Sequence, residues 1–213
     1  MMEWLLIGAL LMAFATLGSA RLGSCIRAVA LQGACLSLAP LCTVGALADP
    51  HRLFLATASF LIKTVAIPAL LFKSLRQAKI QQAVAPTISL HLSLLGGGGL
   101  LVGAFLAAGN FSLPTDPYPP LIVPVALAII AVGFFLLIAR TKAITQVIGF
   151  LVLENGVFLF GITLLGEFPL TVELGVFLDL LVGVFVMGIM IHHINRTFDH
   201  VDTKALTALK DSE

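Results

Sequence analysis

The chain has few charged residues, and this scarcity indicates its surroundings. Only 11% of its 213 residues are Asp, Glu, Lys or Arg, whereas 59% are hydrophobic and the mean hydropathy is +1.09. An ordinary soluble domain carries roughly 25% charged residues. The composition therefore excludes a soluble globular domain and predicts an integral membrane protein, with the lipid bilayer around it and no nucleic-acid partner.

Cysteine is also scarce, and motifs for metals and cofactors are absent. The three cysteines share one apolar segment without a CxxC pair or a nearby His: Cys25, Cys35 and Cys42. Metal and disulfide roles are therefore not expected. The run from Gly96 to Gly99 lacks the Lys and Ser or Thr of a phosphate-binding loop. His192 and His193 are adjacent on a helix and point about 100° apart, which argues against a shared metal. No catalytic, cofactor-binding or metal site is expected in this chain.

Apolar runs of membrane-spanning length recur along the sequence. A bilayer core about 30 Å thick requires a helix of roughly 20 apolar residues. The expected spans are Glu3 to Ala20, Ser24 to Ala48, Leu53 to Phe72, Ile88 to Gly109, Leu121 to Ala139, Ile144 to Leu165 and Thr171 to His192. The sequence thus predicts an all-α, polytopic membrane protein with seven transmembrane helices. Pro68 is expected to kink the third span, and Gly99, Gly103 and Ala107 to let helices approach closely.

The positive charges predict an orientation with the N-terminus outside and the C-terminus inside. With that orientation the inner side carries Arg21, Arg27, Lys73, Arg76, Lys79, Arg140, Lys142, Arg196, Lys204 and Lys210. Only Arg52 then lies outside, as the positive-inside rule requires. The expected location is the inner (cytoplasmic) membrane of the cell, with multiple passes.

A turn-rich outer segment suggests how the chain is divided. Residues 111–120 hold all the Pro and Asp residues of "NFSLPTDPYPP", which favour turns or extended backbone. We expect a four-helix membrane part in residues 1–110 and a three-helix membrane part in residues 121–194. Residues 195–213 form the expected cytoplasmic tail.

Three ionisable residues lie near the middle of their expected spans. At a rise of 1.5 Å per residue, Glu154 is roughly 15 Å deep, Asp179 about 12 Å deep, and Lys63 also central. A charge at the centre of a span costs about 2.5 to 3.5 kcal/mol on insertion scales, so these side chains should face protein or internal water. Burial disfavours the charged form of each group, which allows proton exchange. The functional interpretation is a proton or ion relay, and the alternative is an inert ion pair joining helices.

Other polar residues give weaker signals. His91 begins the fourth span near the inner surface, where it is either a solvated anchor or a proton shuttle. Gln146 and Asn155 are expected to act as polar glue between helices, with a relay role as the alternative.

The last three spans resemble the K subunit of respiratory complex I and the C subunit of Mrp-type antiporters. In the K subunit a Glu is followed four residues later by Asn and a small residue, and here Asn155 and Gly156 match that pair. The matching Glu position is Leu151, and Glu154 stands one turn later on the same helix face. In the next helix "DLLVG", which begins at Asp179, matches the family pattern with Asp in place of Glu.

A longer resemblance, covering nearly the whole chain, is to component E of hydrogenase-4 and formate hydrogenlyase-2 complexes. The residues that carry it are "FLIKTVAIPALL" (60–71), "GFLVLENG" (149–156), "LGVFLD" (174–179) and "LTALK" (206–210). It implies a non-catalytic membrane-arm subunit beside antiporter-like subunits, with nickel-iron and iron-sulfur centres held by other chains. Glu154, Asp179 and Lys63 would then contribute to coupled proton or sodium translocation.

Two other functions remain open from the sequence. One is a purely structural connector of the membrane arm, in which the same charges only hold helices together. The other is a self-contained seven-helix transporter or receptor. A retinal protein of that shape would need a Schiff-base lysine in its last span, and the span Thr171 to His192 has none.

Overall fold

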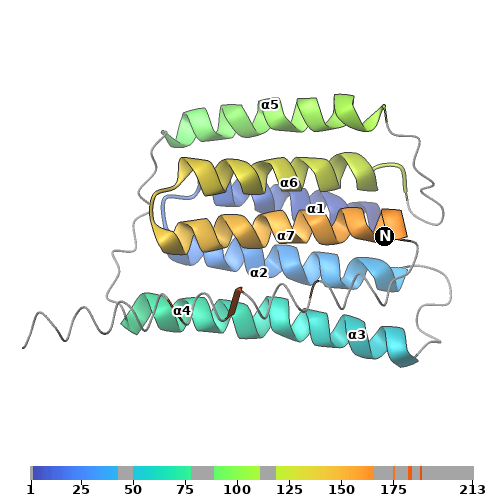
Figure 1. The fold of residues 1–213 in the computed structure, drawn as a ribbon, viewed down its shortest axis with the longest axis horizontal. Helices are drawn as coiled ribbons and strands as arrows, with labels where there is room; N and C mark the ends of the chain where they lie inside the picture. Colours follow the sequence, from blue (N-terminus) through green and yellow to red (C-terminus); the bar gives the residue numbers. More distant parts are fainter. Residues whose placement is uncertain are drawn as a thin grey trace, which may run out of the picture.

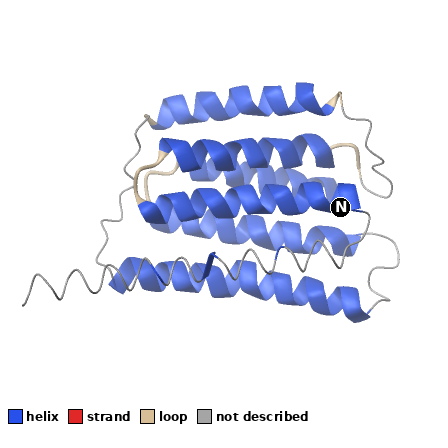
Figure 2. Ribbon diagram, viewed as in Figure 1, coloured by secondary structure: helices blue, strands red, loops and turns tan. Residues whose placement is uncertain are grey.

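The computed structural model describes residues 2–42, 50–77, 89–110 and 119–165, with the single positions 175, 182, 183 and 188. Every regular element within these ranges is helical (Figure 1; Figure 2). The α-helices are α1 (Met2–Gly18), α2 (Leu22–Leu38), α3 (Pro50–Leu61), α4 (Ile67–Gln77), α5 (Leu90–Ala108), α6 (Ile122–Ala139) and α7 (Ala143–Leu165). A 3₁₀ turn, η1 (Ala39–Cys42), follows α2, and a π-helical turn, η3 (Ile62–Ala66), joins α3 to α4. The predicted all-α class is confirmed for these residues.

The helices lie side by side in one bundle (Figure 1). Helix α5 forms one edge and the continuous helix α3–η3–α4 forms the other, with α1, α2, α6 and α7 between them. Helix α6 packs on α1, α5 and α7, while α2 packs on α1, α7 and the α3–η3–α4 helix. The four central helices therefore connect the two edges of the bundle through a shared apolar core.

The helix lengths agree with most of the expected spans. Four stretches are long and apolar enough to cross a membrane: Ala56–Arg76, Leu90–Ala108, Ile122–Ala139 and Ala143–Thr163. Helices α1 and α2 are apolar but shorter. Helix α2 ends at Leu38, well before the expected Ala48, and residues 43–49 lie outside the described part. The seventh expected span also lies outside it, apart from four helical positions, so the count of seven and the orientation stay predictions.

Positive side chains gather at one end of the described bundle. Arg21 and Arg27 lie at the start of α2, and Lys73 and Arg76 lie at the end of α4. The connection between α6 and α7, which carries Arg140 and Lys142, lies at the same end (Figure 1). The six cations that the positive-inside rule uses within the described residues are therefore on one side of the structure.

Pro68 is accommodated by the π-helical turn η3. Proline has no N–H, and its ring clashes with the carbonyl four residues earlier, so a regular helix cannot pass through it unchanged. Here the backbone N–H of Ile67 bonds to the carbonyl of Ile62, five residues back. The expected distortion thus takes the form of an extra residue in one turn, which is the usual form of a π-bulge. Lys63 lies inside this turn.

Helices α6 and α7 touch backbone to backbone through glycines. A Cβ atom added at Gly133 would lie 2.5 Å from the Cα and N atoms of Leu153. One added at Gly156 would lie 2.7 Å from the backbone N of Ile130. No larger residue fits at these two points without moving a helix. This contact fixes the position of the α7 turn that carries Glu154.

The small-residue face expected in α5 makes no contact within the described structure. Around Gly99 and Gly103 no atom lies within 4 Å of an added Cβ, and Ala107 is exposed. The close approach occurs instead at Gly97, where an added Cβ would lie 2.5 Å from Leu17. Within the described part of the chain, α5 turns its Ser93, Gly97 and Ala104 face toward α1 and α6, and the close approach at Gly99, Gly103 and Ala107 stays a prediction.

Candidate functional site

Lys63 and Glu154 form an ion pair in the interior of the bundle. Lys63 comes from η3 and Glu154 from α7, and the lysine Nζ donates to the carboxylate Oε1. Lys63 is 5% exposed and Glu154 2% exposed. Burying either charge alone would cost several kcal/mol, because water is exchanged for a low-dielectric interior. The pair therefore compensates two charges that neither helix could bury separately.

Two amide side chains extend this pair into a chain of polar contacts across the bundle. The Nζ of Lys63 also donates to Oδ1 of Asn155, at 3.2 Å. The Nδ2 of Asn155 donates to Oε1 of Gln32, at 3.2 Å, and the Nε2 of Gln32 donates to the backbone carbonyl of Ala9, at 3.1 Å. We call Glu154, Lys63, Asn155 and Gln32 the polar chain. It links α7, η3, α2 and α1, and all four side chains are buried.

The surroundings of Lys63 fit its ammonium closely. The Nζ lies 5.4 Å from the centre of the Phe158 ring, one turn beyond Glu154, within the range of a cation–π contact. On the α2 side, a Cβ added at Gly33 would lie 2.9 Å from the Cβ of Lys63. Glycine at this position therefore allows η3 to approach α2. The second carboxylate oxygen of Glu154, Oε2, is buried and has no hydrogen-bond partner among the described residues.

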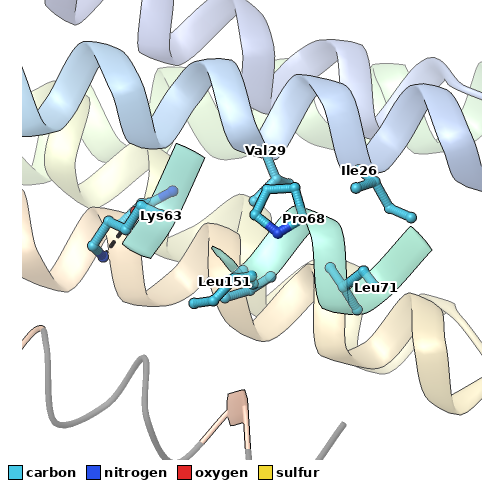
Figure 3. A pocket seen from close by; sticks show the side chains of 8 residues that line it. Ile26, Val29, Lys63, Pro68, Leu71 and Leu151 are labelled. Carbon is cyan, nitrogen blue, oxygen red and sulfur yellow. Dashed lines mark hydrogen bonds between the residues drawn. The ribbon is translucent and has the colours of Figure 1, made fainter. Parts of the chain in front are cut away.

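A small cavity adjoins the polar chain (Figure 3). Its volume is about 10 Å³, close to the least space that one water molecule requires. Two polar side chains line it, Lys63 and Asn155, and the dashed line in Figure 3 marks the hydrogen bond between them. The other lining residues are apolar: Ile26, Val29, Ile67, Pro68, Leu71 and Leu151. The cavity can therefore accept a water only beside the ammonium and the amide.

The structure brings some of the candidate residues together and separates others. Lys63, Glu154 and Asn155 meet, as described above. His91 is exposed at the start of α5, and Gln146 is exposed near the start of α7, so neither contacts the polar chain. Asp179 lies outside the described residues. Gln32 belongs to the site although the sequence analysis did not select it; the available signal was an amide isolated within the apolar run "AVALQGACL".

Arg140 occupies a second buried polar position, between α6 and α7. It is 2% exposed, and its Nη2 donates to the backbone carbonyl of Leu17 at 2.9 Å. That carbonyl belongs to the last turn of α1, where carbonyls lack partners within the helix and a cation is favoured. Burial lowers the pKa of Arg140, but a guanidinium remains protonated. We regard this contact as a structural cap at the end of α1.

The chemistry that the polar chain allows includes proton exchange. Only Glu154 and Lys63 can gain or lose a proton, while the amides of Asn155 and Gln32 orient their neighbours. Among the described residues, no three His, Cys, Asp or Glu side chains are placed to hold a metal ion. The described fold and this site define an all-helical membrane protein that buries a titratable ion pair between apolar helices.

Sequence comparison places the chain in a family. It belongs to the family of the uncharacterized protein Rv0085 of Mycobacterium tuberculosis (strain ATCC 25618 / H37Rv), with 31% identity over 193 residues, 87% of this chain and 85% of that protein. It is also 33% identical to hydrogenase-4 component E of Escherichia coli (strain K12) over 86 residues, 40% of each chain. The component E of Shigella flexneri gives the same values. No family model and no solved structure matches the chain.

The similarity to component E is shorter than the resemblance expected from the motifs. Those motifs extend from residue 60 to residue 210, whereas the matched stretch is 86 residues long and spans less than half of component E. Rv0085, by contrast, matches over most of its length. A partial relationship to a hydrogenase-4 subunit is therefore shown, and equivalence over the whole chain is not.

Proposed function

We propose that this chain is a non-catalytic membrane-arm subunit of a hydrogenase-type complex related to complex I, located in the cytoplasmic membrane. Its polar chain takes part in coupled proton or sodium translocation. The observation that carries the proposal is the buried Lys63–Glu154 pair in the middle of apolar helices. Ionisable groups at that depth are expensive and mark ion pathways by default. The partial similarity to hydrogenase-4 component E supports membership of such a complex.

The contacts suggest how the pair works. Glu154 and Lys63 are the two groups that exchange protons, and Asn155 holds the ammonium in place through a second hydrogen bond. The Oε2 of Glu154, which has no hydrogen-bond partner among the described residues, is the position at which a proton or an ion arrives. The cavity beside Lys63 offers room for one water on the other side of the pair. Asp179 is the proposed next group along this axis.

Other chains supply the rest of such a complex. Antiporter-like membrane subunits are the proposed neighbours, and nickel-iron and iron-sulfur centres are proposed for partner subunits outside the membrane. The face of α5 with Gly99 and Gly103 has nothing within 4 Å among the described residues, and small residues suit close contact between membrane helices. This face is a suitable contact surface for a neighbouring subunit.

Replacing Glu154 with Gln tests the function directly. Glutamine keeps the size and the hydrogen-bonding capacity of the side chain but removes the titratable proton. In sealed vesicles that contain the whole complex, Glu154→Gln should leave electron transfer measurable and should reduce ion uptake per turnover. Measuring uptake with a pH-sensitive dye and with sodium-free buffer separates protons from sodium.

The matched control is Thr163→Val on the same helix. The Thr163 hydroxyl donates to the carbonyl of Phe160 in its own helix and is not part of the polar chain. This variant should pump as the parent does. Normal uptake per turnover in an assembled Glu154→Gln complex, across the pH range, would contradict the proposed translocation role.

One observation favours a second candidate, the structural connector. The polar chain joins α1, α2, η3 and α7 through hydrogen bonds. The same residues could therefore serve only to hold these helices in register. A connector predicts that Glu154→Gln affects assembly and leaves coupling intact in whatever complex forms. Recovery of the chain as a stable and active monomer would instead indicate a self-contained transporter or receptor.

A further inference from the structure

A basic groove lies between α2 and α4, apart from the polar chain. Its volume is about 460 Å³, and its lining consists of Arg27 from α2 and Ala69, Phe72, Lys73 and Arg76 from α4. The three cationic side chains are exposed to the surroundings. Gly23 of α2 lies against Phe72, since a Cβ there would lie 3.7 Å from the ring.

The charge in this groove has no counterpart within the described structure. None of Arg27, Lys73 and Arg76 forms an ion pair with a described carboxylate. The described carboxylates are Glu3, in the first turn of α1, and Glu154, which pairs with Lys63. Three like charges around one hollow repel one another and attract an anion with several acceptor oxygens. Phosphate has several such oxygens, and Arg and Lys side chains bind it through charge-assisted hydrogen bonds.

The position and the apolar wall distinguish a lipid from a soluble phosphate. Ala69 and Phe72 lie one turn before Lys73 and Arg76 on α4, so the groove is apolar toward the middle of the span and cationic at its end. A lipid has the same order, with acyl chains in the bilayer and a phosphate at the surface. Basic hollows between membrane helices on the positively charged side are typical sites for phospholipid headgroups. A free phosphate would make no favourable contact with the apolar wall.

We propose that this groove binds an anionic phospholipid, with its phosphate between Arg27, Lys73 and Arg76 and an acyl chain along Ala69 and Phe72. Because three cations face one hollow, a lipid with two phosphates, such as diphosphatidylglycerol, binds more tightly than phosphatidylglycerol, and uncharged phosphatidylcholine binds weakly. The site belongs to the chain itself and does not depend on the proposed translocation.

The test uses the full chain purified in nanodiscs of phosphatidylcholine. Titrating in spin-labelled diphosphatidylglycerol, phosphatidylglycerol or phosphatidylcholine measures which lipid remains motionally restricted on the protein. Each cation near a lipid surface contributes a free energy that corresponds to roughly fivefold in affinity. The triple variant Arg27→Gln/Lys73→Gln/Arg76→Gln should therefore bind diphosphatidylglycerol with about a hundredfold lower affinity. Arg76→Lys, which keeps the charge, should retain most of the binding.

Arg21→Gln is the matched control. Arg21 is an exposed cation at the same end of the bundle and does not line the groove. Its replacement should leave the selectivity for diphosphatidylglycerol unchanged. The proposal is overturned if the triple variant, folded by circular dichroism, binds this lipid as the parent does. It is also overturned if Arg21→Gln loses as much, or if inorganic phosphate competes as effectively as the lipid, which would reassign the groove to a soluble anion.

Discussion

Removing the ammonium of Lys63 should destabilise the bundle more than removing the charge of Glu154. In Lys63→Met the carboxylate remains 2% exposed, its Oε1 loses the ammonium, and its Oε2 has no described partner to compensate. Breaking a buried pair by removing one partner costs about 3–5 kcal/mol, because an uncompensated charge remains. We expect Lys63→Met to lower the free energy of unfolding by an amount in this range.

The reverse change leaves a better-compensated charge. In Glu154→Gln the ammonium keeps the Oδ1 of Asn155 at 3.2 Å and the ring of Phe158 at 5.4 Å, and the new amide oxygen can still accept a hydrogen bond. The cost should therefore stay near about 1–2 kcal/mol, the value of one weakened charged hydrogen bond. In the double variant Lys63→Met/Glu154→Gln no charge is buried, and a neutral pair of similar volume is often tolerated. Its stability should exceed that of Lys63→Met.

A double-mutant cycle measures this difference. The four proteins are unfolded reversibly in mixed micelles, and the coupling energy is the double-variant loss minus the two single losses. We expect a coupling of about 2–4 kcal/mol in magnitude, with the double variant recovering much of the loss. Additive effects, or a Lys63→Met protein as stable as the parent, would refute the idea that these two charges compensate each other in the bundle.

Two further predictions concern packing and the end of α1. Gly133→Ala should destabilise by about 1–3 kcal/mol in the same assay, because its Cβ would meet the backbone of Leu153, whereas Gly99→Ala should be neutral or slightly stabilising. Arg140→Met should cost about 1.5–3 kcal/mol, since the carbonyl of Leu17 loses a charged donor. Equal effects at the two glycines, or an unchanged Arg140→Met protein, would contradict these contacts.

Composition and periodicity predicted the helical class and most helix limits. The expected span Leu121 to Ala139 differs from α6 by one residue, because prolines precede this long apolar run and Arg140 follows it. The end of α2, in contrast, was predicted too late. The apolar run continues past Leu38, but Pro40 and the 3₁₀ turn Ala39–Cys42 end the helix inside it. Hydropathy indicates whether a segment is apolar enough to cross a membrane. It does not locate a helix end that is caused by backbone geometry.

The site was predictable in part. Depth alone selected Lys63 and Glu154, since both lie near the middle of their spans. Gln32 was missed because a neutral amide hardly changes the hydropathy of an apolar run. The contact of α5 with α1 at Gly97 was also not predicted, since four consecutive glycines leave several faces equally small, and the bulk of Leu17 and Phe14 on α1 determines which of them packs there. These features depend on partners that are distant in sequence.

Packing alone gives a weak reason for an ion pair at this place. Lys63 requires the carboxylate of Glu154 and the amide of Asn155 to be accommodated, whereas a pair of apolar side chains would need neither. Replacing a buried ion pair by well-packed apolar residues is often neutral or even stabilising. Helix association therefore could be achieved here without any charge. An apolar pair cannot provide a group that gains and loses a proton, and for this reason we propose the translocation role in preference to the structural connector.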